Sequence, residues 1–227
     1  MKKMITYAQN FEDILLRRAF ENITDGFYVD VGAHDPIIGS ITKYFYNLGW
    51  RGINIEPGPR FSALVKGRAE DTNLNVAVGA KGEIKFYEIS SGLSTSHSNI
   101  AKSHIDLGYD VHEKIVQTVP LSEILSEIDN VIHFMKIDTE GDERKVLETL
   151  DFEKNRPWIL VIESVHPLQE IQNHDNWEFL VINNKYRFVW FDGLNRWYIS
   201  EEKYELLHHF FITPVNYFDN FITYKEY

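Results

Sequence analysis

Cysteine is absent from the 227 residues, so disulfides, thiolate nucleophiles and cysteine-ligated zinc or iron–sulfur sites are excluded. Long hydrophobic runs are absent too, and segments such as Trp158–Ile162 are far too short to span a bilayer. The basic start, Met1–Met4, is followed by polar residues where the apolar region of a signal peptide would lie. We therefore expect a soluble, cytoplasmic protein without a transmembrane segment.

Positive charge is scarce, since 23 basic residues face 34 acidic ones and give a net charge of −11. A field of this sign repels phosphate backbones and anionic lipid, so nucleic acid is not an expected partner. The hydrophobic share of 44% is ordinary for a folded chain of this length. We expect one domain over residues 1–227.

Short apolar segments, most of them rich in Val and Ile, alternate with helical patterns, which predicts an α/β fold with a mostly parallel sheet. The predicted strands are residues 27–31, 53–55, 74–78, 83–89, 132–137, 158–162, 186–191 and 194–199. The predicted helices are residues 11–19, 41–48, 61–65, 142–150 and 177–182. Asp192-Gly193 between the last two strands predicts a C-terminal antiparallel hairpin.

Two segments lie outside this alternation. Residues 1–25 are predicted to form a helical cover. Residues 90–113 are polar and contain three histidines, and we interpret them as a substrate or lid loop because loops of this length are usually functional.

A ligand crevice is predicted where the first two parallel strands end. Gly32 follows the first strand and lets a ligand approach the backbone, and Glu56 ends the second at the spacing of a ribose-binding acid. The segment Gly32–Pro36 lacks the second glycine of a dinucleotide fingerprint, and its Asp35 would repel phosphate. S-adenosylmethionine has no phosphate, and its ammonium and sulfonium groups favour carboxylates such as Asp30. The alternative is that Asp30 only caps a turn and that Glu56 is a solvated acid.

Acidic residues also end the later strands. Asp138 and Glu140 follow the fourth parallel strand, Glu163 and His166 follow the fifth, and Asp192 lies in the hairpin turn. Because strand ends meet at one edge of a sheet, we expect a pocket of carboxylates with an imidazole. The alternatives are that Glu163 neutralises a buried base and that His166 is an ordinary loop residue.

Five segments carry a resemblance to a known family: Tyr7–Asp13, Val29–Pro36, Asn54–Pro57, Lys136–Gly141 and Phe191–Arg196. In this order they resemble FkbM-type S-adenosylmethionine-dependent methyltransferases, from about residue 7 to residue 221. The resemblance implies a Rossmann-like class I methyltransferase fold, with a seven-stranded sheet whose last strand is antiparallel. It also implies O-methylation of sugar hydroxyls on bacterial glycans, or of polyketide-type natural products.

We therefore predict an S-adenosylmethionine-dependent O-methyltransferase that acts on a sugar hydroxyl in a bacterial glycan or glycolipid precursor. Association with glycan-assembly enzymes would fit this role. The alternatives are a methyltransferase of polyketide-type products, a dinucleotide-dependent oxidoreductase and a non-catalytic nucleotide- or glycan-binding module.

The predicted site residues fall into four sets. The catalytic set is Asp138, Glu140 and His166. The cofactor-binding set is Gln9, Asp30, Gly32, His34, Glu56, Pro57, Ala77 and Asp138. The substrate set is Ser94, Thr95, Glu163, Asp192, Asn195 and Arg196. Asp138, Glu163 and Asp192 are also candidates for an all-oxygen Mg²⁺ or Ca²⁺ site, although we prefer the interpretation that they serve cofactor and acceptor.

Overall fold

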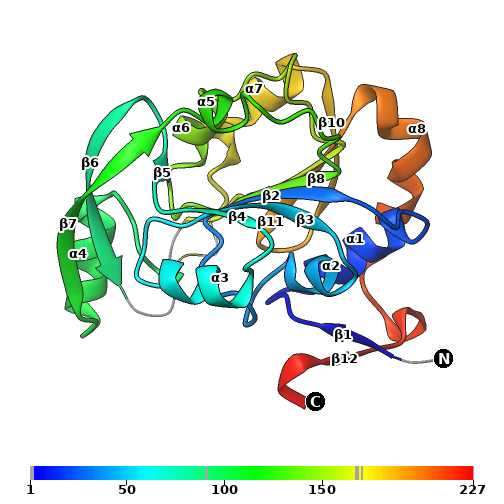
Figure 1. The fold of residues 1–227 in the computed structure, drawn as a ribbon, viewed down its shortest axis with the longest axis horizontal. Coiled ribbons are helices and arrows are strands. Elements are labelled where there is room, and N and C mark those ends of the chain that lie inside the picture. Colours follow the sequence, from blue (N-terminus) through cyan, green and yellow to red (C-terminus); the bar gives the residue numbers. More distant parts are fainter. Residues whose placement is uncertain (1–2, 90–91, 167–168, 170, 227) are drawn as a thin grey trace.

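The computed structural model describes residues 3–89, 92–166, 169 and 171–226. Its centre is a seven-stranded sheet of order β10-β11-β9-β8-β2-β3-β4 (Figure 1). The parallel strands are β2 (Phe27–Val31), β3 (Arg51–Ile55), β4 (Thr72–Leu74), β8 (Phe134–Ile137) and β9 (Ile159–Glu163). The edge strand is β10 (Tyr186–Phe191), and β11 (Asn195–Ser200) lies between β10 and β9 and runs antiparallel to both. The mixed α/β fold with a mostly parallel sheet is thus confirmed.

Helices cover both faces of this sheet and create two hydrophobic cores (Figure 1). One core packs α5 (Leu121–Ile124), α6 (Glu143–Leu147) and α7 (Glu178–Asn183) against the sheet, and the other packs α1 (Glu12–Phe20), α2 (Lys43–Asn47) and α8 (Tyr204–Leu207). In β2, Val29 and Val31 enter the first core and Tyr28 the second. Burial on both faces explains why the central strands are almost continuously apolar.

Two further α-helices and several 3₁₀ turns complete the described helical elements. They are α3 (Phe61–Gly67), α4 (Ser98–Asp106) and the 3₁₀ turns η2 (His174–Asn176), η3 (Glu201–Lys203), η4 (His208–Phe211), η5 (Tyr217–Asp219) and η6 (Tyr224–Glu226). Among the helices of the described ranges, none is long and apolar enough to cross a membrane.

A second, three-stranded sheet of order β5-β7-β6 lies beside the main one. It contains β5 (Ala77–Val78), β6 (Gly82–Ile89) and β7 (Val111–Val119). The strand predicted at 74–78 is therefore divided, because residue 74 ends β4 in the main sheet and residue 77 begins β5 in the small one. The prediction of a continuous strand was wrong.

The segment predicted as a loop at 90–113 contains helix α4 and the start of β7; Ser90 and Ser91 lie outside the described residues. Helix α4 buries Ala101 and His104. A polar sequence could form this helix because only a narrow apolar stripe is needed against a small sheet. A role as a lid stays a prediction.

The N-terminal cover begins with a strand rather than a helix. β1 (Met4–Thr6) pairs in parallel with β12 (Phe221–Thr223), so the two ends of the chain lie side by side (Figure 1). Helix α1 follows Phe11, whose backbone is left-handed at φ 64°. This pairing brings C-terminal residues to the edge of the sheet where the parallel strands end.

Candidate functional site

A cavity of about 1210 Å³ opens at the carboxyl edge of the parallel strands. This exceeds the roughly 300–1,000 Å³ of a pocket for one small ligand, so there is room for two. The predicted residues that line it are Gln9, Gly32, His34, Glu56, Pro57, Ala77, Ser94, Asp138, Glu140, Glu163, His166 and Asn195. The predicted residues that do not line it are Asp30, Thr95, Asp192 and Arg196.

The turn after β2 is fixed by close backbone packing. Gly32 has φ +79°, and a Cβ atom there would lie 1.8 Å from the main-chain oxygen of Asp138. The N–H groups of Gly32 and Ala33 both donate to the carbonyl of Ile55, at 2.9 and 3.1 Å. The turn after β8 therefore requires glycine at position 32, whether or not a ligand also approaches the backbone there.

Glu56 completes this turn from the end of β3. Its Oε2 accepts the N–H of His34 at 2.7 Å, and its Oε1 accepts the N–H of Gly58 at 2.5 Å. The side chain is 6% exposed, and burial raises its pKa, although the two backbone hydrogen bonds oppose the rise. All three amides of the 32–34 turn are thus engaged by protein acceptors, which leaves no amide cradle for a pyrophosphate.

Asp30 lies behind the cavity and is only 1% exposed. Its Oδ2 accepts the hydroxyl of Thr42 at 3.0 Å, and its Oδ1 lies 3.5 Å from Nζ of Lys136. Lys136 also donates to the carbonyl of Gly32 at 2.7 Å and lies 3.3 Å from Asp138. Burial lowers the pKa of Lys136, but the negative charges of Asp138 and Asp30 outweigh burial. The net pKa is above the ordinary value for lysine, so the ammonium stays charged. The structure makes Asp30 a counter-ion of Lys136, not a residue that a ligand can touch directly.

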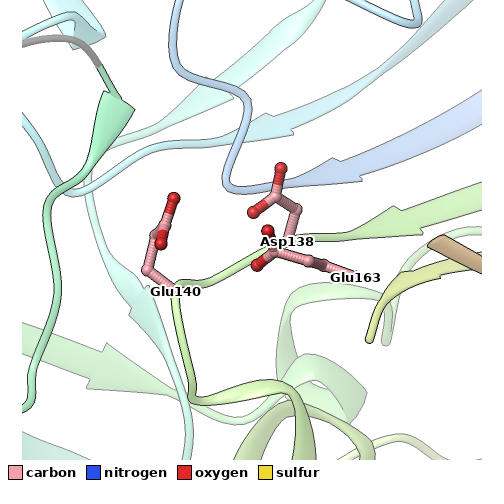
Figure 2. Close-up of side chains that lie close together, drawn as sticks. All are labelled: Asp138, Glu140 and Glu163. Atoms are coloured by element: carbon pink, nitrogen blue, oxygen red, sulfur yellow. The ribbon is translucent and has the colours of Figure 1, made fainter. Parts of the chain in front are cut away.

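Three carboxylates converge at the ends of β8 and β9. Asp138, Glu140 and Glu163 each offer an oxygen within 4.8 Å of the others. Figure 2 shows the Glu163 carboxylate next to that of Asp138, with Glu140 facing them from the adjacent turn. Burial, followed by the negative charge of Asp138, raises the pKa of both Glu140 and Glu163 well above the usual range.

The turn that presents Glu140 is held from within the chain. Oε1 of Glu143 accepts the N–H groups of Thr139 and Gly141 at 3.0 and 3.1 Å. The buried hydroxyl of Thr95 donates to the carbonyl of Glu140 at 3.0 Å. Thr95, predicted to bind substrate, therefore supports this turn, whose residue 140 has a left-handed φ of 54°.

Asp142 fastens the α4 segment to the same turn. It accepts hydrogen bonds from Ser96 and from His97 Nε2, the latter at 3.0 Å, and pairs with Lys145 at 2.5 Å. Burial raises its pKa, but these three partners outweigh it and lower the pKa to about 2. Asp142 in turn raises the pKa of His97, mainly through their hydrogen bond.

Asp192 serves the hairpin turn between β10 and β11. Its Oδ1 accepts the N–H groups of Leu194 and Asn195, at 2.9 and 2.7 Å, and its Oδ2 accepts the indole N–H of Trp197 at 2.7 Å. Among the described residues, Glu140 rather than Asp192 lies with Asp138 and Glu163. The prediction that grouped Asp192 with them was wrong, because its oxygens are needed by backbone amides.

Arg196 points away from the cavity. Its guanidinium donates to Glu178 Oε1 at 2.7 Å and to the hydroxyl of Tyr198 at 2.9 Å. Residues alternate between the two faces of a strand, so Arg196 faces opposite to Asn195, which does line the cavity. His166 lines the rim and is exposed.

Glu12 is a cavity residue that the sequence reasoning missed. Its Oε1 accepts the side-chain amide of Asn195 at 3.0 Å, and its Oε2 accepts the N–H of Asn10 at 2.9 Å. It is 5% exposed, and burial, helped by the charge of Asp192, raises its pKa to about 7. Glu12 begins a helix, where an acidic residue is expected for the dipole alone, so the local pattern gave no sign of a cavity.

The C-terminal segment also reaches the cavity. Tyr224 and Lys225 line it, and the rings of Tyr7 and Tyr224 lie 5.1 Å apart. They arrive there through the pairing of β1 with β12, which no local sequence signal predicts.

A family model described as the methyltransferase FkbM domain matches residues 30–188. The match spans the turn after β2, Glu56 and all three clustered carboxylates, whereas Glu12 and the turn at Asp192 lie outside it. No solved structure matches the chain.

Proposed function

The chain belongs to the FkbM methyltransferase family, and from this premise we propose that it transfers a methyl group from S-adenosylmethionine to a hydroxyl oxygen. We assign its sheet, in which the antiparallel β11 lies between β9 and the edge strand β10, to the Rossmann-like class I methyltransferase fold. The observation that carries the choice of cofactor is the engagement of the turn amides. Gly32, Ala33 and His34 all donate within the protein, which suits a cofactor without phosphate and disfavours a dinucleotide.

The residues present fit such a cofactor. S-adenosylmethionine supplies a methyl group on a cationic sulfonium and carries a ribose and an ammonium group. Glu56, at the end of β3, is placed to accept the ribose hydroxyls through its remaining lone pairs. Asp138, beside the Gly32 turn, faces the cavity where positive charge would be stabilised.

The acceptor needs a group that removes its proton, because a sugar hydroxyl is a poor nucleophile at neutral pH. The candidates are the carboxylates of Asp138 and Glu140 and the imidazole of His166, all of which line the cavity. The raised pKa of Glu140 makes it a stronger proton acceptor than an ordinary carboxylate, once it is ionised.

We propose a sugar hydroxyl of a bacterial glycan or glycolipid precursor as the acceptor. Glu12, Ser94, Glu163 and Asn195 give the cavity wall several hydrogen-bonding groups, which suit a polyhydroxylated molecule. Methylation of a polyketide-type product is the second candidate for the same chemistry. The volume of about 1210 Å³ supports simultaneous binding of cofactor and acceptor.

Thermal unfolding in the presence of S-adenosylhomocysteine or NADH tests the proposal. At 100 times its dissociation constant, a ligand adds about 2.7 kcal/mol, which for a chain of this size raises Tm by roughly 5–10 °C. We expect this shift with S-adenosylhomocysteine and none with NADH. A shift with NADH alone would favour the oxidoreductase, and no shift with either would favour a non-catalytic glycan-binding module.

A further inference from the structure

The carboxylate cluster at the ends of β8 and β9 has more negative charge than the protein neutralises. Lys136 lies near Asp138 and Asp30 and is shared between them. Within the part of the chain that the structure describes, neither Glu140 nor Glu163 forms an ion pair. Glu163 is buried and Asp138 and Glu140 are half-buried, and carboxylates shielded from water without a counter-charge are costly, so the cluster needs either protons or a cation.

Glu163 gives a second indication that a ligand belongs here. Its side chain is 7% exposed, and its Oε2 is buried without a hydrogen-bond partner among the described residues. The carboxylate points into the cluster (Figure 2). A buried charged acceptor that is left unsatisfied destabilises the folded protein, and a ligand that binds at this position would remove that cost.

The spacing of the three oxygens suits one hard cation. Ca²⁺ binds oxygens at about 2.3–2.6 Å, so two of its ligands are at most about 5 Å apart, and Mg²⁺ requires a slightly tighter set. The oxygens of Asp138, Glu140 and Glu163 lie within 4.8 Å of one another. Their cavity is open to solvent at the His166 side, so water can complete the coordination shell.

We propose that Asp138, Glu140 and Glu163 together bind one hard divalent cation, of the Mg²⁺ or Ca²⁺ kind. The proposal that the ion binds is based on the spacing of the three carboxylates, whereas its role in catalysis rests on the proposed function. In that role it coordinates the acceptor oxygen and favours loss of the hydroxyl proton. The three carboxylates then act as ligands, and the proton passes to the imidazole of His166.

A Mn²⁺ titration of the purified full chain tests the site. Metals are first removed with a chelator, and binding of the added Mn²⁺ is then followed by electron paramagnetic resonance. We expect one saturable Mn²⁺ per chain, displaced by Mg²⁺, both with and without S-adenosylhomocysteine. Glu163→Gln and Glu140→Gln should each weaken Mn²⁺ binding at least about tenfold. Glu127→Gln, which removes the same charge from an exposed position, should leave it unchanged.

The inference is overturned if no saturable Mn²⁺ binds in either condition, or if both cluster variants bind it as the wild type does. If Glu163→Gln does not fold, Glu140→Gln decides alone, because Glu140 is only partly buried. If the protein binds S-adenosylhomocysteine but does not bind Mn²⁺, the cation site is rejected and the proposed function is kept. Failure of S-adenosylhomocysteine to bind would reject the proposed function, whatever Mn²⁺ does.

Discussion

Substitution of Glu56 by Gln tests how the cofactor is held. The carboxylate accepts two backbone N–H groups, at 2.7 Å from His34 and 2.5 Å from Gly58, while lining the cavity. A glutamine has one acceptor oxygen, and its NH₂ group would face one of these donors. If the carboxylate also accepts the ribose hydroxyls, affinity for S-adenosylhomocysteine should fall by about 1.5–3 kcal/mol, the range for hydrogen bonds to a charged group. That corresponds to roughly 10- to 150-fold in Kd.

Because Glu56 also shapes the 32–34 turn, loss of affinity alone does not identify a ribose contact. Calorimetry should therefore compare S-adenosylhomocysteine with its 2′,3′-dideoxy analogue on the wild type and on Glu56→Gln. A direct contact makes the two changes non-additive, with a coupling energy of roughly 0.5–3 kcal/mol. Glu70→Gln, an exposed carboxylate after α3, is the matched control and should bind both ligands as the wild type does.

The same contact predicts a pH dependence. Burial raises the pKa of Glu56, so its carboxylate gains a proton at a higher pH than an ordinary glutamate. Affinity for S-adenosylhomocysteine should fall as pH is lowered through that raised pKa, and Glu56→Gln should lack this step. In the calorimetric comparison, Glu56→Gln could weaken binding of S-adenosylhomocysteine and of its 2′,3′-dideoxy analogue equally, which would show that Glu56 acts only through the turn. Unchanged affinity for S-adenosylhomocysteine in a folded variant would remove Glu56 from the site.

In urea unfolding, Gly32→Ala should lower the free energy of unfolding by at least about 3 kcal/mol, because the Cβ would overlap the backbone of Asp138. Gly39→Ala is the control: its φ is also positive, at +74°, but the space around it is open, so it should lower the free energy of unfolding by only about 1–2 kcal/mol. The pKa of Glu12 is raised to about 7, so the stability it contributes is present below its unfolded value of 4.5 and is lost as pH rises through 7. Between pH 4.5 and 8 the wild type should therefore lose about 3 kcal/mol that Glu12→Gln does not, and parallel pH profiles of the two proteins would contradict this. The pKa of Asp142 is lowered to about 2, so Asp142→Asn should cost about 2 kcal/mol at neutral pH and speed amide hydrogen exchange in α4. The difference between Asp142→Asn and wild type should shrink as pH falls below 3.8 toward 2, and exchange in α4 that does not change would contradict the docking role.

The sequence alone determined the elements whose two faces are both buried. The segment 27–31 appears in the structure with the predicted bounds, and the segment predicted at 158–162 appears one residue later, because short apolar runs between turn residues have few other stable conformations. It also determined the position of acids at the strand ends, since parallel strands place their carboxyl ends at one edge. Glu56, Asp138 and Glu163 line the cavity for that reason.

Tertiary structure alone decided which of these acids meet. Asp30 and Asp138 both lie at the carboxyl end of a parallel strand. Asp30 is buried beside Lys136, whereas Asp138 lines the cavity. Asp192 folds back onto its own turn, and Glu140 reaches the cluster through a left-handed backbone. Glu12 enters the wall only because Asn195 binds it from 183 residues away along the chain. Such contacts depend on the distances between elements in space, which local pattern and composition do not encode.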